Sequence, residues 1–382
     1  MNYAFAWVRV MDTFEIELPP KFAANCLMGL LYHLHKSYSL TYYGDRVIIA
    51  GPDPYKALQD VLLSARQIME DKNRYAGSMM IRLPASGNDK RILEALKKSY
   101  GLGADATIID FAKVVQENLD VKGQYPLPSI LKPEFYEFNR LPGYAGESSR
   151  KLRERFPILS ISLSLIGYFV CKAGSAQMDR GDWVSVIVTP EVMSRNHIYS
   201  VDPKFRLSTF VEPVQGLKVY LSQRKYNIAG LFPETALQLW LTTHMGGAKI
   251  NLYAINEPGG QTPATIYSSM KIDLEPIYKS LIYYDLLNQN VKPYLVKILE
   301  HALRAVERSA AKSLSVRFSV LLYEVLSRVK RLEEFIYAAS REYSAWSHSP
   351  PSKNHPLFMS YLVSRWAALV ARHLTRAAGG LV

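Results

Sequence analysis

Five cationic or titratable side chains recur at the spacing of one helix face between Val291 and Ser313. Successive members of this set are three or four residues apart: Lys297, His301, Arg304, Arg308 and Lys312. Because residues three and four apart lie on the same side of an α-helix, the pattern predicts one continuous helix that carries a basic stripe. Such a stripe could bind the phosphates of a polyanion, or it could be an ordinary solvated helix face.

The positive charge of the chain is concentrated in its last quarter. Of the net charge of +12 over 382 residues, residues 290–382 carry +8. Charge of this kind attracts nucleic acid or an anionic membrane surface, although it does not define a fold. The chain also contains 25 Tyr, 14 Phe and 5 Trp. Basic side chains hold phosphates and aromatic rings stack bases, so the combination suits a protein that grips nucleic acid.

Three further groups of basic residues fit this interpretation. Three arginines share a face of a second predicted helix, a basic cluster precedes Pro157, and a basic pair stands between tyrosines in YLSQRKY. For the cluster, plain protein surface is the alternative interpretation. The predicted nucleic-acid-binding residues are therefore Arg150, Lys151, Arg153, Arg224, Lys225, Lys297, Arg304, Arg308, Lys312, Arg365, Arg372 and Arg376.

No catalytic constellation with convincing spacing is present in the sequence. HExxH, GxSxG and GxxxxGK[ST] motifs are absent, and Cys26 and Cys171 have no CxxC or Cys/His spacing around them. His244 shares a helix face with Trp240, which indicates a packed side chain and not a ligand. The sequence thus predicts no enzyme, no metal site and no cofactor.

Composition and hydropathy predict a globular, cytoplasmic protein with no membrane partner. Hydrophobic residues make up 48% of the chain and charged residues 21%, and the N-terminal residues show no export signal. The most apolar run, Ile158–Val170, has 13 residues and is too short to cross a bilayer of about 30 Å as a helix. Since its serines alternate with Ile and Leu, this run predicts a buried strand.

Periodicity divides the chain into four predicted segments of an α+β protein. Residues 1–122 alternate strands and helices and predict a mixed α/β domain. Residues 123–157 are interrupted by five prolines and predict a linker or docking arm. Residues 158–289 predict a sheet domain with inserted helices. Residues 290–382 predict a basic, antiparallel helical bundle.

Individual helices and strands within these segments can be assigned from their periodicity. The predicted helices cover residues 21–35, 54–70, 89–100, 105–119, 232–244, 275–288, 291–313, 314–344 and 357–377. The predicted strands lie within residues 3–18, 39–43, 46–50, 78–83, 158–170, 183–189, 201–211, 217–221, 249–256 and 264–273. Two hairpins are expected, one formed by 39–43 with 46–50 and one formed by 249–256 with 264–273.

The order of these parts resembles a known family. The segments LKVYLSQRKYNIAGLFPETALQLWLTTH and AKINLYAINEPGGQTPATIYSSMKIDL precede a basic helical C-terminus. This layout is similar to that of the large subunit of archaeal type I-A (Apern-subtype) CRISPR effector complexes, most closely over residues 217–289. The resemblance implies a non-enzymatic protein that sits at the crRNA 5′ end and reads the protospacer-adjacent motif in duplex DNA. It further implies that the protein helps to open the duplex and receives a separate helicase-nuclease.

The partners implied by the resemblance are the crRNA-containing effector complex subunits, target DNA and that helicase-nuclease. Base pairing with the guide would read most of the target, while the protein reads a short duplex motif and holds backbone. Lysines and arginines of the bundle would track one DNA strand with salt-dependent affinity.

Two other classes of function stay open. The segment Arg341-Glu-Tyr-Ser-Ala-Trp-Ser-His348 resembles the Arg-x4–6-His motif of HEPN ribonucleases. In that family a helical dimer brings both residue types to an RNA 2′-OH and its scissile phosphate. In this chain Ser-Pro-Pro follows His348 and should end the helix. The third class is a structural scaffold whose basic helices dock an acidic protein.

Overall fold

The computed structural model describes most of the chain in two compact units. The described residues are 12–19, 21–32, 34, 38–43, 45–76, 81–83, 87–133, 155–177, 183–191, 234–257, 264–303 and 309–379. Unit 1 takes the described residues of 1–70 and 81–171, and unit 2 takes those of 71–80, 172–191 and 202–382. The mixture of small sheets with many helices, ending in a helical region, confirms the predicted α+β fold class. The predicted domain boundaries stay predictions.

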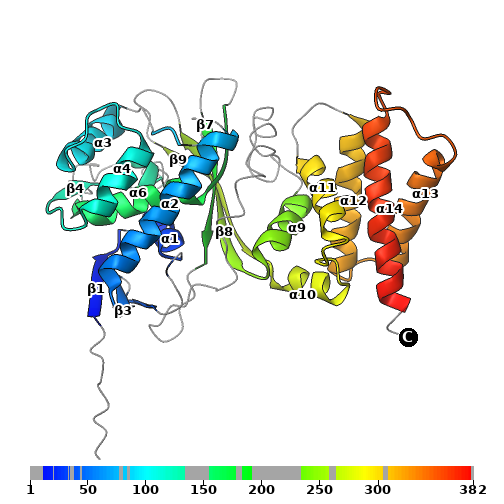
Figure 1. The fold of residues 1–382 in the computed structure, drawn as a ribbon, viewed down its shortest axis with the longest axis horizontal. Helices are drawn as coiled ribbons and strands as arrows, with labels where there is room; N and C mark the ends of the chain where they lie inside the picture. The colour runs from blue at the N-terminus through cyan, green and yellow to red at the C-terminus, as the bar shows by residue number, and fades with distance from the viewer. Residues whose placement is uncertain are drawn as a thin grey trace, which may run out of the picture. The chain divides into compact units, whose positions relative to one another are not determined.

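Unit 1 combines small antiparallel sheets with helices (Figure 1). Its strands are β1 (Asp12–Glu17), β2 (Ser39–Tyr42), β3 (Arg46–Gly51), β4 (Gln124–Pro126) and β5 (Arg155–Pro157). Its helices are α1 (Lys21–Leu31), α2 (Pro54–Ala76, whose last residues belong to unit 2), α3 (Gly87–Ser99), α4 (Ile108–Glu117), the 3-10 turn η2 (Ser129–Leu131) and α6 (Ile158–Cys171).

The strands of unit 1 pair as two separate sheets. One sheet has the order β1-β3-β2, and Leu40 of β2 lies opposite Ile49 of β3, which confirms the first predicted hairpin. In the other sheet β4 pairs with β5, so the described ends of the Pro-rich segment are held together. Residues 81–83 are not in a strand, and the prediction of a strand over 78–83 is wrong for these residues.

The prediction of a buried strand at Ile158–Val170 is wrong, because this run forms the helix α6. Nearly every residue of α6 is buried, so no polar face marks the helical period in the sequence. A short apolar run of this kind fits a buried strand and a buried helix equally well. Of the serines that suggested alternation, Ser162 is satisfied inside the helix, because its hydroxyl donates to the Ile158 carbonyl at 2.7 Å.

Unit 2 contains a four-stranded antiparallel sheet and the C-terminal helices. The sheet has the order β6-β7-β8-β9, with strands β6 (Lys172–Gln177), β7 (Trp183–Pro190), β8 (Lys249–Glu257) and β9 (Thr265–Asp273). The helices are α9 (Glu234–Met245), α10 (Glu275–Tyr283), α11 (Lys292–Leu303), α12 (Ala310–Leu326), α13 (Leu332–Ser347) and α14 (Phe358–Gly379). The second predicted hairpin is confirmed as β8 with β9. The predicted strands at 201–211 and 217–221 lie outside the described residues.

The sheet of unit 2 buries one unusual charge. The Lys172 side chain on β6 is 1% exposed, and its Nζ lies 3.5 Å from Oε1 of Glu257 on β8. Burial lowers the pKa of the Lys172 ammonium, and the carboxylate of Glu257 opposes that shift. The backbone carbonyl of the same residue accepts a hydrogen bond of 2.7 Å from Nζ of Lys72. Polar contacts therefore reinforce this edge of the sheet.

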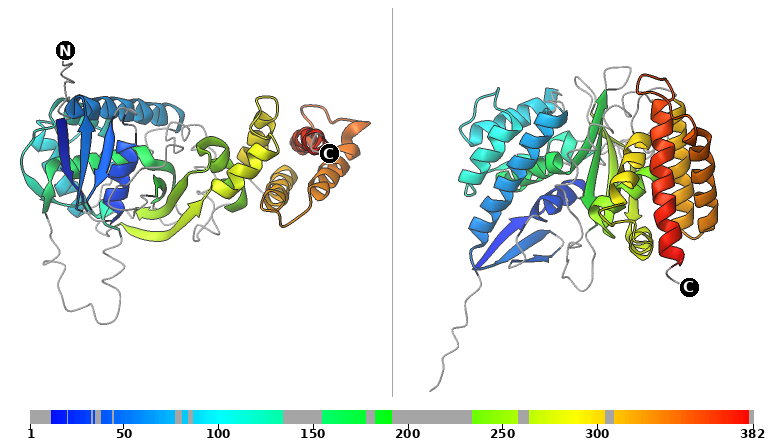
Figure 2. Two further views of the ribbon diagram at one scale, coloured as in Figure 1. Left: turned by 90° about the horizontal axis from the view of Figure 1, so that it is seen from below. Right: turned by 45° about the vertical axis from the view of Figure 1, so that its right-hand side comes forward.

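The C-terminal helices pack as a bundle in which α13 and α14 run antiparallel (Figures 1 and 2). Tyr343 near the end of α13 stacks on Tyr361 near the start of α14, with ring centroids 6.3 Å apart. The predicted long helix over 314–344 is wrong, because the chain leaves the helix after Leu326 and turns at Arg328, whose φ is 61°. No helix in the described part of the chain is both long and apolar enough to cross a membrane.

The tight crossing of α1 and α6 in unit 1 gives a test of the fold. A Cβ atom added at Gly167 would lie 2.1 Å from the backbone oxygen of Cys26, and both residues are in the core. We expect Gly167→Ala to lower the free energy of unfolding by about 1–3 kcal/mol or more, since the backbones of α1 and α6 must move apart. Denaturant unfolding measures this change.

The matched control for that variant is Gly103→Ala. A Cβ at Gly103 meets no atom within 4 Å, so the control should leave the free energy of unfolding unchanged or slightly raised. Equal stability of the two variants would contradict the observed crossing of α1 and α6.

Candidate nucleic-acid interface

Helix α14 presents an apolar stripe to the bundle and a basic stripe to the outside. Its buried side chains follow helical spacing: Val363, Ala367, Val370, Ala371 and Leu374. The predicted binding residues of this helix, Arg365, Arg372 and Arg376, are all exposed. Because the apolar stripe contacts α11, α12 and α13, the rotation of α14 about its axis is fixed. The sequence prediction of a shared arginine face therefore agrees with the structure.

The three arginines of α14 carry charge that no carboxylate in the described part of the chain neutralises. Among the described residues, no carboxylate forms an ion pair with Arg365, Arg372 or Arg376, whereas some other cations of the bundle are paired. Arg317 pairs with Glu342, and Lys330 lies 3.0 Å from Glu324. Exposed guanidinium groups without a carboxylate partner are the side chains best suited to bidentate contacts with phosphate.

A second helix brings one more predicted residue to α14. Lys297 on α11 is exposed, and its Nζ lies 5.7 Å from the ring centroid of Trp366 and 6.0 Å from that of Tyr294. Lys297 therefore lies over Trp366, which follows Arg365 in the chain but is turned by about 100° from it around the helix. The ammonium group is attracted by the negative faces of the two rings, which restricts where it can reach.

The predicted single helix over 291–313 is wrong. Helix α11 ends at Leu303, and Ser309 adopts extended backbone dihedrals of −88° and 143° before α12 begins. The Ser309 hydroxyl oxygen accepts a hydrogen bond of 3.2 Å from the backbone N–H of Lys312, which is an N-cap. Lys297 and Lys312 therefore lie on different helices, and the basic stripe is not one continuous row. Ser309 could have been recognised as an N-cap in the sequence, but the regular spacing of the charged residues was given more weight.

The remaining predicted binding residues cannot be placed by the structure. Arg304 and Arg308 lie between α11 and α12, outside the described residues. The same holds for the cluster and the pair predicted earlier in the chain: Arg150, Lys151, Arg153, Arg224 and Lys225. Arg155, at the end of that cluster, is described and lines a hollow of about 310 Å³ together with Lys122.

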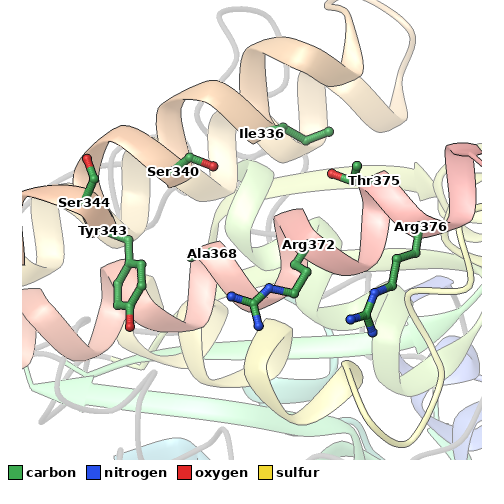
Figure 3. A pocket seen from close by; sticks show the side chains of 8 residues that line it. All are labelled: Ile336, Ser340, Tyr343, Ser344, Ala368, Arg372, Thr375 and Arg376. Carbon is green, nitrogen blue, oxygen red and sulfur yellow. The ribbon is translucent and has the colours of Figure 1, made fainter. Parts of the chain in front are cut away.

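The basic face of α14 borders a groove that the sequence did not predict (Figure 3). The groove has a volume of about 520 Å³ and lies between α13 and α14. Figure 3 shows Arg372 and Arg376 on α14, with Tyr343 and two serines on α13. The lining residues are Ile336, Ser340, Tyr343, Ser344, Ala368, Arg372, Thr375 and Arg376, and none of them is acidic. The α13 residues could not be found from sequence because they depend on how the two helices pair.

Arg341 and His348 stand at the end of α13. The Arg341 guanidinium lies 3.5 Å from Oε1 of Glu342, a carboxylate that also pairs with Arg317. The hydrogen bond from Arg317, followed by the charges of both arginines, lowers the pKa of Glu342. His348 is the C-cap of α13, so the helix ends where Ser-Pro-Pro was expected to end it. A catalytic role for this pair stays a hypothesis.

His244 is packed, as predicted. Its ring stacks on Trp240 with centroids 4.1 Å apart, and its Nδ1 lies 2.8 Å from the Trp240 carbonyl oxygen. Burial lowers the pKa of His244, which favours the neutral imidazole. Within the described ranges, no group of three or more His, Cys, Asp or Glu side chains could hold a metal ion.

The comparison with known families identifies the class of protein. Residues 54–343, more than half of the chain, match the model of the family described as CRISPR-associated protein, CsaX. The chain therefore belongs to this CRISPR-associated family, and a role in CRISPR defence follows. A search of curated proteins found no match.

The contact between Lys297 and Trp366 can be tested directly. We expect Lys297→Gln to lower the free energy of unfolding by about 0.5–1 kcal/mol, because the exposed ammonium no longer lies over the half-buried Trp366 ring. Denaturant unfolding gives the energy, and tryptophan fluorescence reports the changed environment of the ring. Lys353→Gln, which removes an exposed charge that forms no ion pair among the described residues, is the control and should change neither quantity. Identical results for both variants would contradict the contact.

Proposed function

We propose that this protein is the non-catalytic large subunit of a crRNA-guided type I-A CRISPR interference complex. In this role it binds target DNA at the protospacer-adjacent motif, helps to open the duplex and contacts the crRNA-containing subunits and a separate helicase-nuclease. Family membership supports the CRISPR context. The observation that carries the DNA-binding part is the row of exposed arginines on α14 that have no acidic partner in the described structure.

The physical argument rests on uncompensated charge. Like charges in a row repel one another. Near neutral pH, the arginines therefore stabilise the free protein no more than uncharged polar side chains at the same positions would. Phosphates of nucleic acid would neutralise Arg365, Arg372 and Arg376 and release counterions. Contacts of this kind fix the position of a protein on the backbone and carry no sequence information, so reading a duplex motif requires additional residues.

The first test is a salt titration of DNA affinity. We expect replacement of Arg365, Arg372 and Arg376 by Gln to weaken binding about equally for every sequence, because phosphates are alike. The dependence of log K on log salt should flatten by about 0.7–0.9 for each phosphate that is no longer neutralised, the smaller value applying to single strands. Since Gln is nearly as good a helix former as Arg, α14 should keep its stability.

The matched control removes three other exposed cations, Lys98, Arg328 and Lys353, for which no described carboxylate forms an ion pair. It has the same net charge as the test variant and should keep most of the salt slope. Equal slopes for the two variants would mean that the α14 row is solvated surface. Retained binding to an acidic protein with no binding to DNA would favour a scaffold function.

The second test concerns catalysis. We expect the purified protein to leave single-stranded RNA intact, since the sequence contains no acid/base or metal set with convincing spacing. Cleavage that both Arg341→Ala and His348→Ala abolish would replace this proposal with a HEPN-type ribonuclease. Gel analysis of labelled RNA, with Lys353→Ala as the control variant, makes the distinction.

A further inference from the structure

The groove between α13 and α14 changes in character along its length. Because the two helices are antiparallel, Tyr343 lies at the end where α14 begins, near Tyr361, and Ile336 lies toward the end that carries Arg376. From Ala368 to Arg376 is eight residues of α14, or about 12 Å at the helical rise. One end of the groove is therefore aromatic and the other cationic (Figure 3).

The cationic end suits phosphate. Arg372 and Arg376 are one helical turn apart and have no ion pair with any described carboxylate. The Thr375 hydroxyl donates its proton to the Ala371 carbonyl at 3.0 Å, so the donors available to a phosphate at this end are the two guanidinium groups. Two guanidinium forks beside each other can hold adjacent phosphates of one strand.

The aromatic end suits a nucleobase. The Tyr343 ring is half-buried and stacks on Tyr361 with an interplanar angle of 25°, so its orientation is fixed before any ligand arrives. Ala368 has a small side chain at this part of the groove wall, which leaves room beside the ring. A fixed aromatic face binds bases at low entropic cost and without strong preference among them.

We propose that the groove binds one nucleotide of a single strand, with its base against Tyr343 and its flanking phosphates on Arg372 and Arg376. A volume of about 520 Å³ is within the range of pockets for small ligands and is suited to one nucleotide unit. A duplex covers its base faces by stacking and offers only its backbone to such a site. This inference rests on the proposed function and adds that the bundle prefers single strands, such as an opened DNA strand or crRNA, over duplex.

The test fills the groove without changing charge. Ala368→Leu and Ser340→Leu each place a bulky side chain in its wall, and Tyr343→Leu keeps bulk but removes the ring. The control is Ala345→Leu on an exposed position of α13 outside the groove. Fluorescence anisotropy at one fixed salt concentration measures affinity for a labelled oligo-dT, an oligo-U and a DNA hairpin duplex. Melting curves show that each variant is folded.

We expect each of the three groove variants to lose about tenfold in affinity for the single strands, the scale of one base stacked on an aromatic ring. Duplex affinity should change by less than about twofold, because the arginines are retained. Ala345→Leu should match the wild type. A folded groove variant that keeps full single-strand affinity overturns the inference, and an equal loss for duplex and single strand does so as well.

Failure of this inference can be told apart from failure of the proposed function. Wild-type protein that binds neither single strands nor duplex would refute both. Wild-type protein that binds duplex and single strands, with groove variants unchanged, would refute the groove alone. Competition by a free nucleoside monophosphate as strong as that by oligo-dT would assign the groove to a small ligand and overturn the assignment to a strand.

Discussion

The arrangement of the basic surface depends on the packing of one apolar stripe. Val363, Ala367, Val370 and Leu374 are fully buried, and α14 contacts α11, α12 and α13. Burial of a Val or Leu side chain contributes about 1.5–3 kcal/mol, so the stripe fixes the rotation of α14 firmly. The arginines then face outward because they occupy the other side of the same helix. The same packing sets α13 beside α14 and so creates the groove.

Charge in this bundle is divided between paired and unpaired cations. Arg317 and Lys330 have carboxylate partners, and Lys297 lies over an aromatic ring. The arginines of α14 have no acidic partner within the described ranges. Paired surface cations contribute little to stability and bind external anions weakly, since their charge is already neutralised. The row of α14 arginines is consequently where we propose that an external polyanion binds, in line with the proposed function.

Sequence patterns predicted helices and strands well where an element has one polar and one apolar face. They failed where an element has no such difference between its faces. The β8–β9 hairpin and helix α14 follow from alternation and from helical spacing. Helix α6 was mistaken for a strand because it is buried on all sides. The helix over 291–313 was predicted as continuous because charge periodicity was given more weight than the capping serine Ser309. Because the Ser309 side chain caps the start of a new helix, the helical spacing of the charges before it does not continue past it.

The sequence by itself determined that the C-terminal quarter is basic, that Arg365, Arg372 and Arg376 share one helix face, and that His244 is packed. These properties depend on spacing within a single helix, which the chain encodes directly. Only the tertiary structure decided which cations are neutralised, as for Arg317 with Glu342, and that Tyr343 lines the same groove as Arg372 and Arg376. Both depend on contacts between helices, and the distances across such contacts are set by packing of the whole bundle and not by any local pattern.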